Sequence, residues 1–168
     1  YSSAASDVYK RQLVFRNLLV QGLNQDRALE VVATASDPFE ARDKIIEYRP
    51  DVMTLDIELP RMSGLEFLRK LMPQYPLPVV IISALSEKVF DAMKAGAVDF
   101  VAKPQVTERE QLRNFLCSEL PVKIKVASTA RVSRYKKPVA FAADQHLSVR
   151  SDIDIIAVSY THLRAHET

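Results

Sequence analysis

The sequence predicts an α/β fold in which helices cover both faces of a parallel sheet. Helical and strand-like segments alternate along residues 13–120, which is typical of parallel strands joined by helices. One of the expected strands, 77–83 (LPVVIIS), is almost continuously apolar, as a strand buried on both faces should be. Three polar residues, Asp56, Ser83 and Lys103, each lie at or next to the carboxyl end of a different expected strand, which is the edge where such sheets bind ligands.

The expected helices combine apolar side chains at helical spacing with residues that favour helix ends. Asp37 is suited to be an N-cap, and Pro38 follows it at the first helical position. Ser86 is a second candidate N-cap, and Gly96 is suited to end the helix that begins there. The helices are expected over residues 13–24, 37–48, 64–72, 86–96 and 106–120.

The expected strands are short and rich in β-branched residues, and they cover residues 29–35, 51–56, 77–83 and 97–104. Residues 122–151 contain scattered Ser, Ala, Lys and Arg without a clear period, and we interpret them as an irregular linker tail. Residues 153–158 (IDIIAV) are apolar again and would suit a buried strand.

Composition and length limit the possible functions. With 168 residues and a formal net charge of +2, the chain is long enough for one domain and a tail, and its charge gives no general case for nucleic-acid binding. We expect no membrane insertion, because no apolar run approaches the ~18 residues that span a bilayer. The single cysteine, Cys117, excludes an internal disulfide and suits a cytoplasmic protein.

The three polar residues at the strand ends suggest phosphoryl chemistry. A carboxylate such as Asp56 is able to attack a phosphoryl group if nearby cations and donors neutralise the charge. Lys103 would supply a positive charge and Ser83 a hydroxyl donor, and Mg²⁺ usually supplies the rest. Taken singly, a capping Asp, a turn Ser and a surface Lys are the plain alternatives.

Residues 16–104 resemble the receiver domain of bacterial two-component response regulators. The resemblance rests on the stretches DVMTLDIELPRMSGLEFLRKL, PVVIISALS and AGAVDFVAKPQ, and on the spacing of Asp56, Pro60, Gly64, Ser83 and the Lys-Pro pair at 103–104. It implies a three-layer flavodoxin-like fold with strand order 2-1-3-4-5. It also implies that Asp56 accepts a phosphoryl group from a histidine kinase.

The resemblance assigns roles to five further residues. Ser83 and Lys103 would contact the phosphoryl group, and the bond between Lys103 and Pro104 would be cis. Phe100 would be the aromatic side chain that rotates on phosphorylation, although a plain core role remains open. The carbonyl of Glu58 would join Asp56 as a ligand of Mg²⁺.

The sequence departs from the receiver pattern at its start. A receiver begins with an apolar strand that ends in two adjacent acids, which hold Mg²⁺, and neither the strand nor the acidic pair is found. Lys10 and Arg11 stand about where the acids belong. Because two cations would repel Mg²⁺, we expect this chain to bind the metal poorly and, for that reason, to be phosphorylated poorly.

Within the response regulators, the motifs resemble those of chemotaxis protein-glutamate methylesterase/glutaminase. That enzyme carries a receiver, a linker and an esterase domain that acts on chemoreceptors. Residues 152–158 are similar to the opening strand of the esterase domain, but no G-x-S-x-G motif follows, so its catalytic domain is expected to be absent here. The alternative is the receiver of another response regulator, either single-domain or DNA-binding.

The expected domain plan places a receiver lacking its first strand at 13–121, a linker at 122–151 and the start of an esterase domain at 152–158. Both ends, 1–12 and 159–168, break the pattern abruptly and are interpreted as foreign segments. Without a first strand, the strands at 29–35 and 51–56 would each keep an unpaired inner edge. We therefore hypothesise that residues 153–158 fill this position; the alternative is that they remain free or helical.

Overall fold

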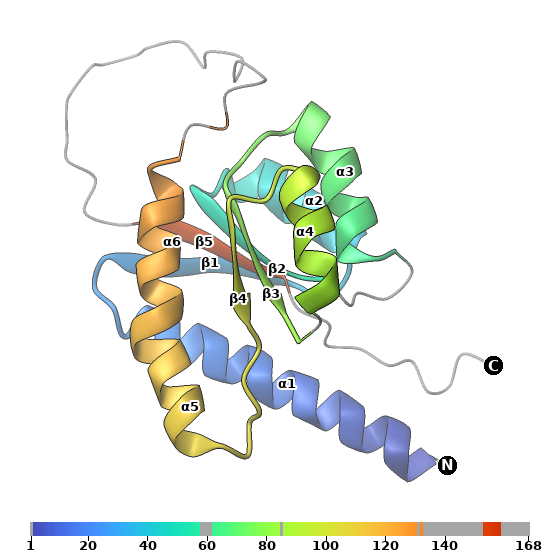
Figure 1. The fold of residues 1–168 in the computed structure, drawn as a ribbon, viewed down its shortest axis with the longest axis vertical. Coiled ribbons are helices and arrows are strands. Elements are labelled where there is room, and N and C mark those ends of the chain that lie inside the picture. The colour runs from blue at the N-terminus through green and yellow to red at the C-terminus, as the bar shows by residue number, and fades with distance from the viewer. Residues whose placement is uncertain (1, 58–61, 85, 131, 133–152, 159–168) are drawn as a thin grey trace.

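The computed structural model describes residues 2–57, 62–84, 86–130, 132 and 153–158, and its centre is a parallel sheet of five strands (Figure 1). The strands lie in the order β1-β5-β2-β3-β4. Their bounds are β1 Leu29–Ala35, β5 Ile153–Val158, β2 Val52–Asp56, β3 Val79–Ser83 and β4 Asp99–Ala102. The expected flavodoxin-like α/β fold is confirmed.

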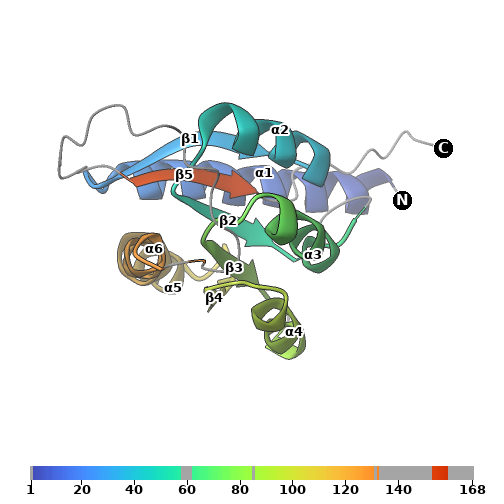
Figure 2. The same cartoon turned by 90° about the horizontal axis from the view of Figure 1, so that it is seen from above.

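Helices cover both faces of the sheet (Figures 1 and 2). Apolar residues of α2, α3 and α4 form the core on one face, and those of α1, α5 and α6 form the core on the other. The helices are α1 Ser2–Asn24, α2 Pro38–Tyr48, α3 Gly64–Gln74, α4 Val89–Lys94, α5 Arg109–Asn114 and α6 Leu120–Ser128. A 3₁₀ turn, η1 Ser86–Lys88, precedes α4, and a π-helical segment, η2 Phe115–Glu119, joins α5 to α6.

Several helix ends follow from local sequence chemistry. Asp37 caps α2 by accepting hydrogen bonds from the backbone N–H groups of Phe39 and Glu40, both at 2.9 Å. Gly96 has φ +114° directly after α4, where the left-handed backbone ends the helix as expected. Ser63 caps α3 by accepting from the backbone N–H of Glu66 at 3.1 Å.

Helix α1 begins at Ser2, well before the expected start at residue 13. Residues 2–12 contain neither Gly nor Pro, so nothing in them interrupts the helical backbone. The buried side chains of Phe15, Leu19 and Leu23 recur every four residues and fix α1 against the sheet. The interpretation of 1–12 as a foreign segment is independent of this conformation and remains a prediction.

The helix expected to end at residue 120 continues to Ser128, so the linker interpretation is wrong for residues 122–128. Pro121 lies inside the continuous helical run of α5, η2 and α6, where it has no N–H group to donate to the preceding turn, and the π-helical segment directly before it accommodates this change. Ile124 and Ala127 are buried, which anchors the extension in the core.

Strand β5 lies between β1 and β2 and is parallel to both, as the hypothesis for residues 153–158 required. Ile155 is opposite Val31 on one side and Val52 on the other. The spatial order is therefore the expected 2-1-3-4-5, with the last strand of the chain in the place of the first. Figure 1 shows β5, in red, beside the blue β1.

The middle of the sheet is buried on both faces. Every residue of β2 and β3 is buried, which confirms the expectation drawn from the continuous apolar run at 77–83. Each fully buried Val, Leu, Ile or Met side chain contributes about 1.5–3 kcal/mol to stability. These two strands therefore form a rigid support for the residues at their carboxyl ends.

Candidate functional site

The structure brings the three predicted polar residues to one edge of the sheet. Asp56 ends β2, Ser83 ends β3, and Lys103 directly follows β4. Ser83 is opposite Ala102 in the parallel register, and the backbone N–H of Lys103 donates to the carbonyl oxygen of Ser83 at 3.0 Å. The chain after β4 is thus fastened to the end of β3, which brings the Lys103 side chain within reach of β2.

Asp56 and Lys103 form an ion pair at this edge. The Lys103 Nζ atom lies 3.1 Å from Oδ2 of Asp56, and the two side chains are 24% and 8% exposed. Because the pair is largely removed from water, its attraction is screened less than that of the exposed pairs on the surface. The carboxylate at the end of β2 therefore has a fixed positive charge beside it.

Phe15 of α1 contacts the same lysine and was not among the expected site residues. Its ring centroid lies 4.6 Å from the Lys103 Nζ atom, a distance typical of a cation–π contact. Phe15 is itself buried, with its ring centroid 6.1 Å from that of Phe115. The side chain of Lys103 is thus held between a carboxylate on one strand and an aromatic ring on a helix.

Gly64 makes the close approach of α3 to this edge possible. Its backbone N–H donates to the carbonyl oxygen of Ile57 at 2.7 Å. A Cβ atom at residue 64 would lie 2.3 Å from the carbonyl oxygen of Asp56 and 2.8 Å from Cα of Ile57, both backbone atoms. The sequence marked Gly64 only by its spacing, whereas the structure supplies a steric reason for glycine.

Ser83 and Phe100 lie in different surroundings. Ser83 is 4% exposed, and a contact between its hydroxyl and a phosphoryl group stays a prediction. Phe100 is 37% exposed on β4, with the Nζ atom of Lys123 5.8 Å from its ring centroid. That lysine also pairs with Asp99 at 3.1 Å, which links β4 to α6 beside the predicted switch residue.

The expectation of a cis bond before Pro104 is wrong. No peptide bond among the described residues is cis, so the bond between Lys103 and Pro104 is trans. The trans isomer is the intrinsically favoured form even before proline. The ion pair between Lys103 and Asp56 forms with this trans geometry.

The residues that the structure describes do not fit Mg²⁺. Within those residues, no group of three or more His, Cys, Asp or Glu side chains gathers to hold a metal. Lys10 and Arg11, where the acidic pair was expected, are exposed cations on α1, and Asp56 already pairs with Lys103. Hard divalent cations require several oxygen ligands, so one paired carboxylate is not enough. The carbonyl of Glu58, the other predicted ligand, lies outside the described residues.

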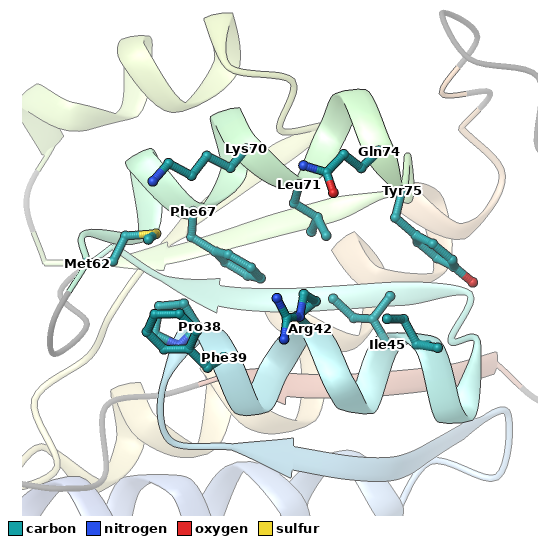
Figure 3. A pocket seen from close by; sticks show the side chains of 11 residues that line it. Pro38, Phe39, Arg42, Ile45, Met62, Phe67, Lys70, Leu71, Gln74 and Tyr75 are labelled. Carbon is teal, nitrogen blue, oxygen red and sulfur yellow. The ribbon is translucent and has the colours of Figure 1, made fainter.

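A separate cavity of about 360 Å³ lies between α2 and α3, away from the predicted site residues (Figure 3). Figure 3 shows side chains of the two helices facing each other across it, with Phe67 and Leu71 on one side and Ile45 on the other. Arg42 and Lys70 add positive charge to a lining that is otherwise mainly apolar. Neither Asp56 nor Lys103 contributes to it.

No helix in the described part of the chain is long and apolar enough to cross a membrane.

Comparisons with known proteins show which family the chain belongs to. The family model of the response regulator receiver domain matches residues 12–116. The chain is 66% identical over 122 residues to a protein-glutamate methylesterase/protein-glutamine glutaminase of Syntrophomonas wolfei, which covers 73% of this chain and 36% of that protein. It is 54% identical over 125 residues to a protein of the same description from Syntrophotalea carbinolica, which covers 72% and 35%.

The chain thus spans about a third of the length of these curated relatives. Among solved structures, it is similar to the response regulator domain of Thermotoga maritima CheB, with 35% identity and a TM-score of 0.62. That match covers 69% of this chain and 89% of the solved domain, so the likeness extends over nearly the whole of a receiver. The chain belongs to the family of response regulator receiver domains and is similar to the receiver of CheB-type chemotaxis response regulators.

Proposed function

We propose that this receiver accepts a phosphoryl group on Asp56 from a histidine kinase. A carboxylate oxygen of Asp56 would form a bond to phosphorus as the bond between phosphorus and the imidazole nitrogen of the donor breaks. The electron pair of the broken bond stays on that nitrogen. The observation that carries the proposal is the Lys103 Nζ atom 3.1 Å from the Asp56 carboxylate at the carboxyl edge of the sheet, where it would offset the added negative charge.

Receiver domains in general use Mg²⁺ for this reaction, and we infer that this chain binds the ion poorly. The support is that no group of three or more His, Cys, Asp or Glu side chains gathers among the described residues, and that the Asp56 carboxylate pairs with Lys103. In the sequence, the cations Lys10 and Arg11 stand about where the acidic pair of the family belongs. Phosphorylation of this chain is accordingly expected to be slow and incomplete, even with a reactive donor.

The regulated activity that fits best is that of a protein-glutamate methylesterase/glutaminase domain in a longer protein. That domain would act on chemoreceptors. The two curated relatives at 66% and 54% identity both bear that description, which favours it over a DNA-binding output. Apolar side chains are exposed on α4, β4 and α6, the region around the predicted switch residue Phe100, and a covering domain would bury them: Phe90, Met93, Phe100, Val122 and Val126. Phosphorylation would shift the balance between two arrangements of this surface.

We infer a cytoplasmic location, which is where a receiver would meet its kinase and where the lone Cys117 would remain reduced.

A small phosphodonor tests the assignment of Asp56. The chain is incubated with acetyl phosphate, with and without Mg²⁺, and its intact mass is measured over time. We expect slow, partial addition of one phosphoryl group that hydroxylamine removes and that Asp56→Asn abolishes. Asp43→Asn is the matched control, because this acid is exposed on α2. Labelling that survives Asp56→Asn would refute Asp56 as the acceptor, and rapid stoichiometric labelling that requires Mg²⁺ would refute the poor metal site.

A further inference from the structure

The centre of the sheet is completed by a strand from the far end of the chain. Strands β1 and β2 do not pair with each other, because β5 lies between them and pairs with both. Six residue pairs join β5 to β1, and four join it to β2. The inner edges of β1 and β2 therefore form the two sides of a position for one extended, parallel segment.

The position is also bounded above and below the sheet. Helices α1 and α2 both contact β5, and they belong to the cores on opposite faces (Figure 2). An extended segment at this place thus meets strand edges on two sides and helices on the other two. Of the four elements around this position, three (α1, β1 and α2) come before residue 49 in the sequence, and only β2 comes after it.

The connection to β5 continues well beyond its last described helix. The links from β1 to β2, from β2 to β3 and from β3 to β4 each contain a helix packed on the sheet, and the link from β4 to β5 contains α5, η2 and α6. After α6 ends at Ser128, residues 129–152 lead to β5, and a segment of that length reaches up to about 80 Å when extended. Because this link is covalent, it keeps the strand near its position and raises the effective concentration of the strand there.

The pairing of β5 with β1 is less regular than the rest of the sheet. Its register shifts between Val31 and Ala33, so Val32 has no partner in β5. The pairs of β2 with β3, of β3 with β4 and of β2 with β5 run without a shift. The N–H group of Val31, which is opposite Ile155 in the register, donates to Oδ1 of Asn24 at 2.9 Å. The pairing of β5 with β1 therefore contains one irregularity that its pairing with β2 lacks.

We propose that the interval between β1 and β2 is a strand-binding site and that residues 153–158 of the same chain are its reversible ligand. The ligand class is an extended, β-branched-rich peptide bound parallel to both neighbours through backbone hydrogen bonds, which is strand addition inside a sheet instead of at its edge. The proposal does not depend on phosphorylation of Asp56.

Cleavage of the link in the folded full chain tests the proposal. A protease site is inserted between residues 140 and 141, and the purified protein is cut without denaturant. We expect the tail fragment to co-elute with the body at high concentration and to separate on dilution, because cleavage abolishes the effective concentration. A fluorescent peptide of residues 151–160 (SDIDIIAVSY) should then bind the body saturably, as measured by anisotropy.

A peptide with Ile155→Pro is the matched control. Ile155 is opposite Val31 and Val52, and proline removes the N–H group needed for pairing at a central position. We expect its affinity to fall by at least about tenfold. Equal binding of the two peptides, or no binding of either, would overturn the proposal. So would a tail that no dilution releases, since the strand would then be an integral part of the sheet.

Two measurements on the uncut chain remain informative if the cleaved body precipitates. Hydrogen exchange should be faster at the amides of β5 than at those of β3, and equal protection of the two strands would contradict a reversible ligand. Light scattering should give a monomer. A stable dimer that Ile155→Pro dissolves would show that the strand comes from a second copy and would overturn the assignment to the same chain.

Discussion

Replacing Gly64 by alanine is the most direct test of the close approach at the edge of the sheet. The added Cβ would lie 2.3 Å from the carbonyl oxygen of Asp56, 2.8 Å from Cα of Ile57 and 3.1 Å from the carbonyl carbon of Asp56. All three are backbone atoms, so no side chain is able to rotate away. Either α3 or the end of β2 must move, and β2 is buried along its whole length.

The cost of Gly64→Ala follows from these distances. Overpacking of a closely packed site typically costs about 1–3 kcal/mol of folding free energy. Alanine recovers at most about 1 kcal/mol of helix propensity, and less at the first residue of α3. A net loss of about 1–2 kcal/mol would lower the urea midpoint by about 0.5–1 M at an m-value near 2 kcal/mol/M. Circular dichroism during urea unfolding measures both quantities.

Gly22→Ala is the matched control, because the three atoms nearest to its Cβ would be side-chain atoms of Leu116, at 3.0–3.4 Å. A shift of a few tenths of an ångström between α1 and η2 would relieve this contact, and the gain in helix propensity within α1 offsets its cost. We expect a stability within about 0.5 kcal/mol of the parent chain. The reasoning fails if Gly64→Ala keeps the parent midpoint, or if the two variants lose the same stability.

Three further experiments test the interactions of charged side chains. Lys103→Ala leaves the buried Asp56 carboxylate without its cation and should cost about 1–3 kcal/mol in urea unfolding, so an unchanged midpoint would contradict the ion pair. Phe15→Leu and Lys103→Met combined in a double-mutant cycle should show a coupling of about 0.5–1 kcal/mol, and zero coupling would exclude the cation–π contact. The hydrogen bond from Lys125, with a further one from the backbone N–H of Ala28, lowers the pKa of Asp26 from its ordinary value. Asp26→Asn should therefore lose less than about 1 kcal/mol at neutral pH, and its stability should converge with that of the parent as pH falls through the folded-state pKa; a constant difference would refute the linkage.

Site residues could be predicted from the sequence where they end a strand that is buried on both faces, because such a strand is a continuous apolar run. Strands β2 and β3 are buried on both faces and read as apolar runs, so the polar residues that interrupt them stand out as strand ends. Asp56 and Ser83 were found in this way, Lys103 was found as the cation at the end of the next expected strand, and the parallel register then brings the three together. The prediction needed only the alternation of elements and the general rule for the carboxyl ends of parallel strands.

Other features of the site depend on contacts between distant parts of the chain. Phe15 appeared as one apolar residue in a helical pattern, and nothing near it indicates that its ring lies against Lys103. Gly64 was marked by spacing, but its steric role depends on how closely α3 approaches β2. The end of the last helix was placed too early because the residues after 121 show no clear period in the sequence, whereas in the structure the buried Ile124 and Ala127 hold them in the helix.

One physical difference explains why the five-stranded sheet is complete although the Mg²⁺ site is not. An inner strand position requires an extended, mainly apolar segment whose backbone pairs on both sides, and many sequences meet that requirement. Residues 153–158 meet it and pair up to Val158, which is opposite Leu55, the residue before Asp56. A metal site needs particular carboxylates at that end, and the residues that follow Val158 in the sequence are Ser159 and Tyr160. Replacing the strand therefore restores the support beneath Asp56 without restoring the acids that would hold Mg²⁺ beside it.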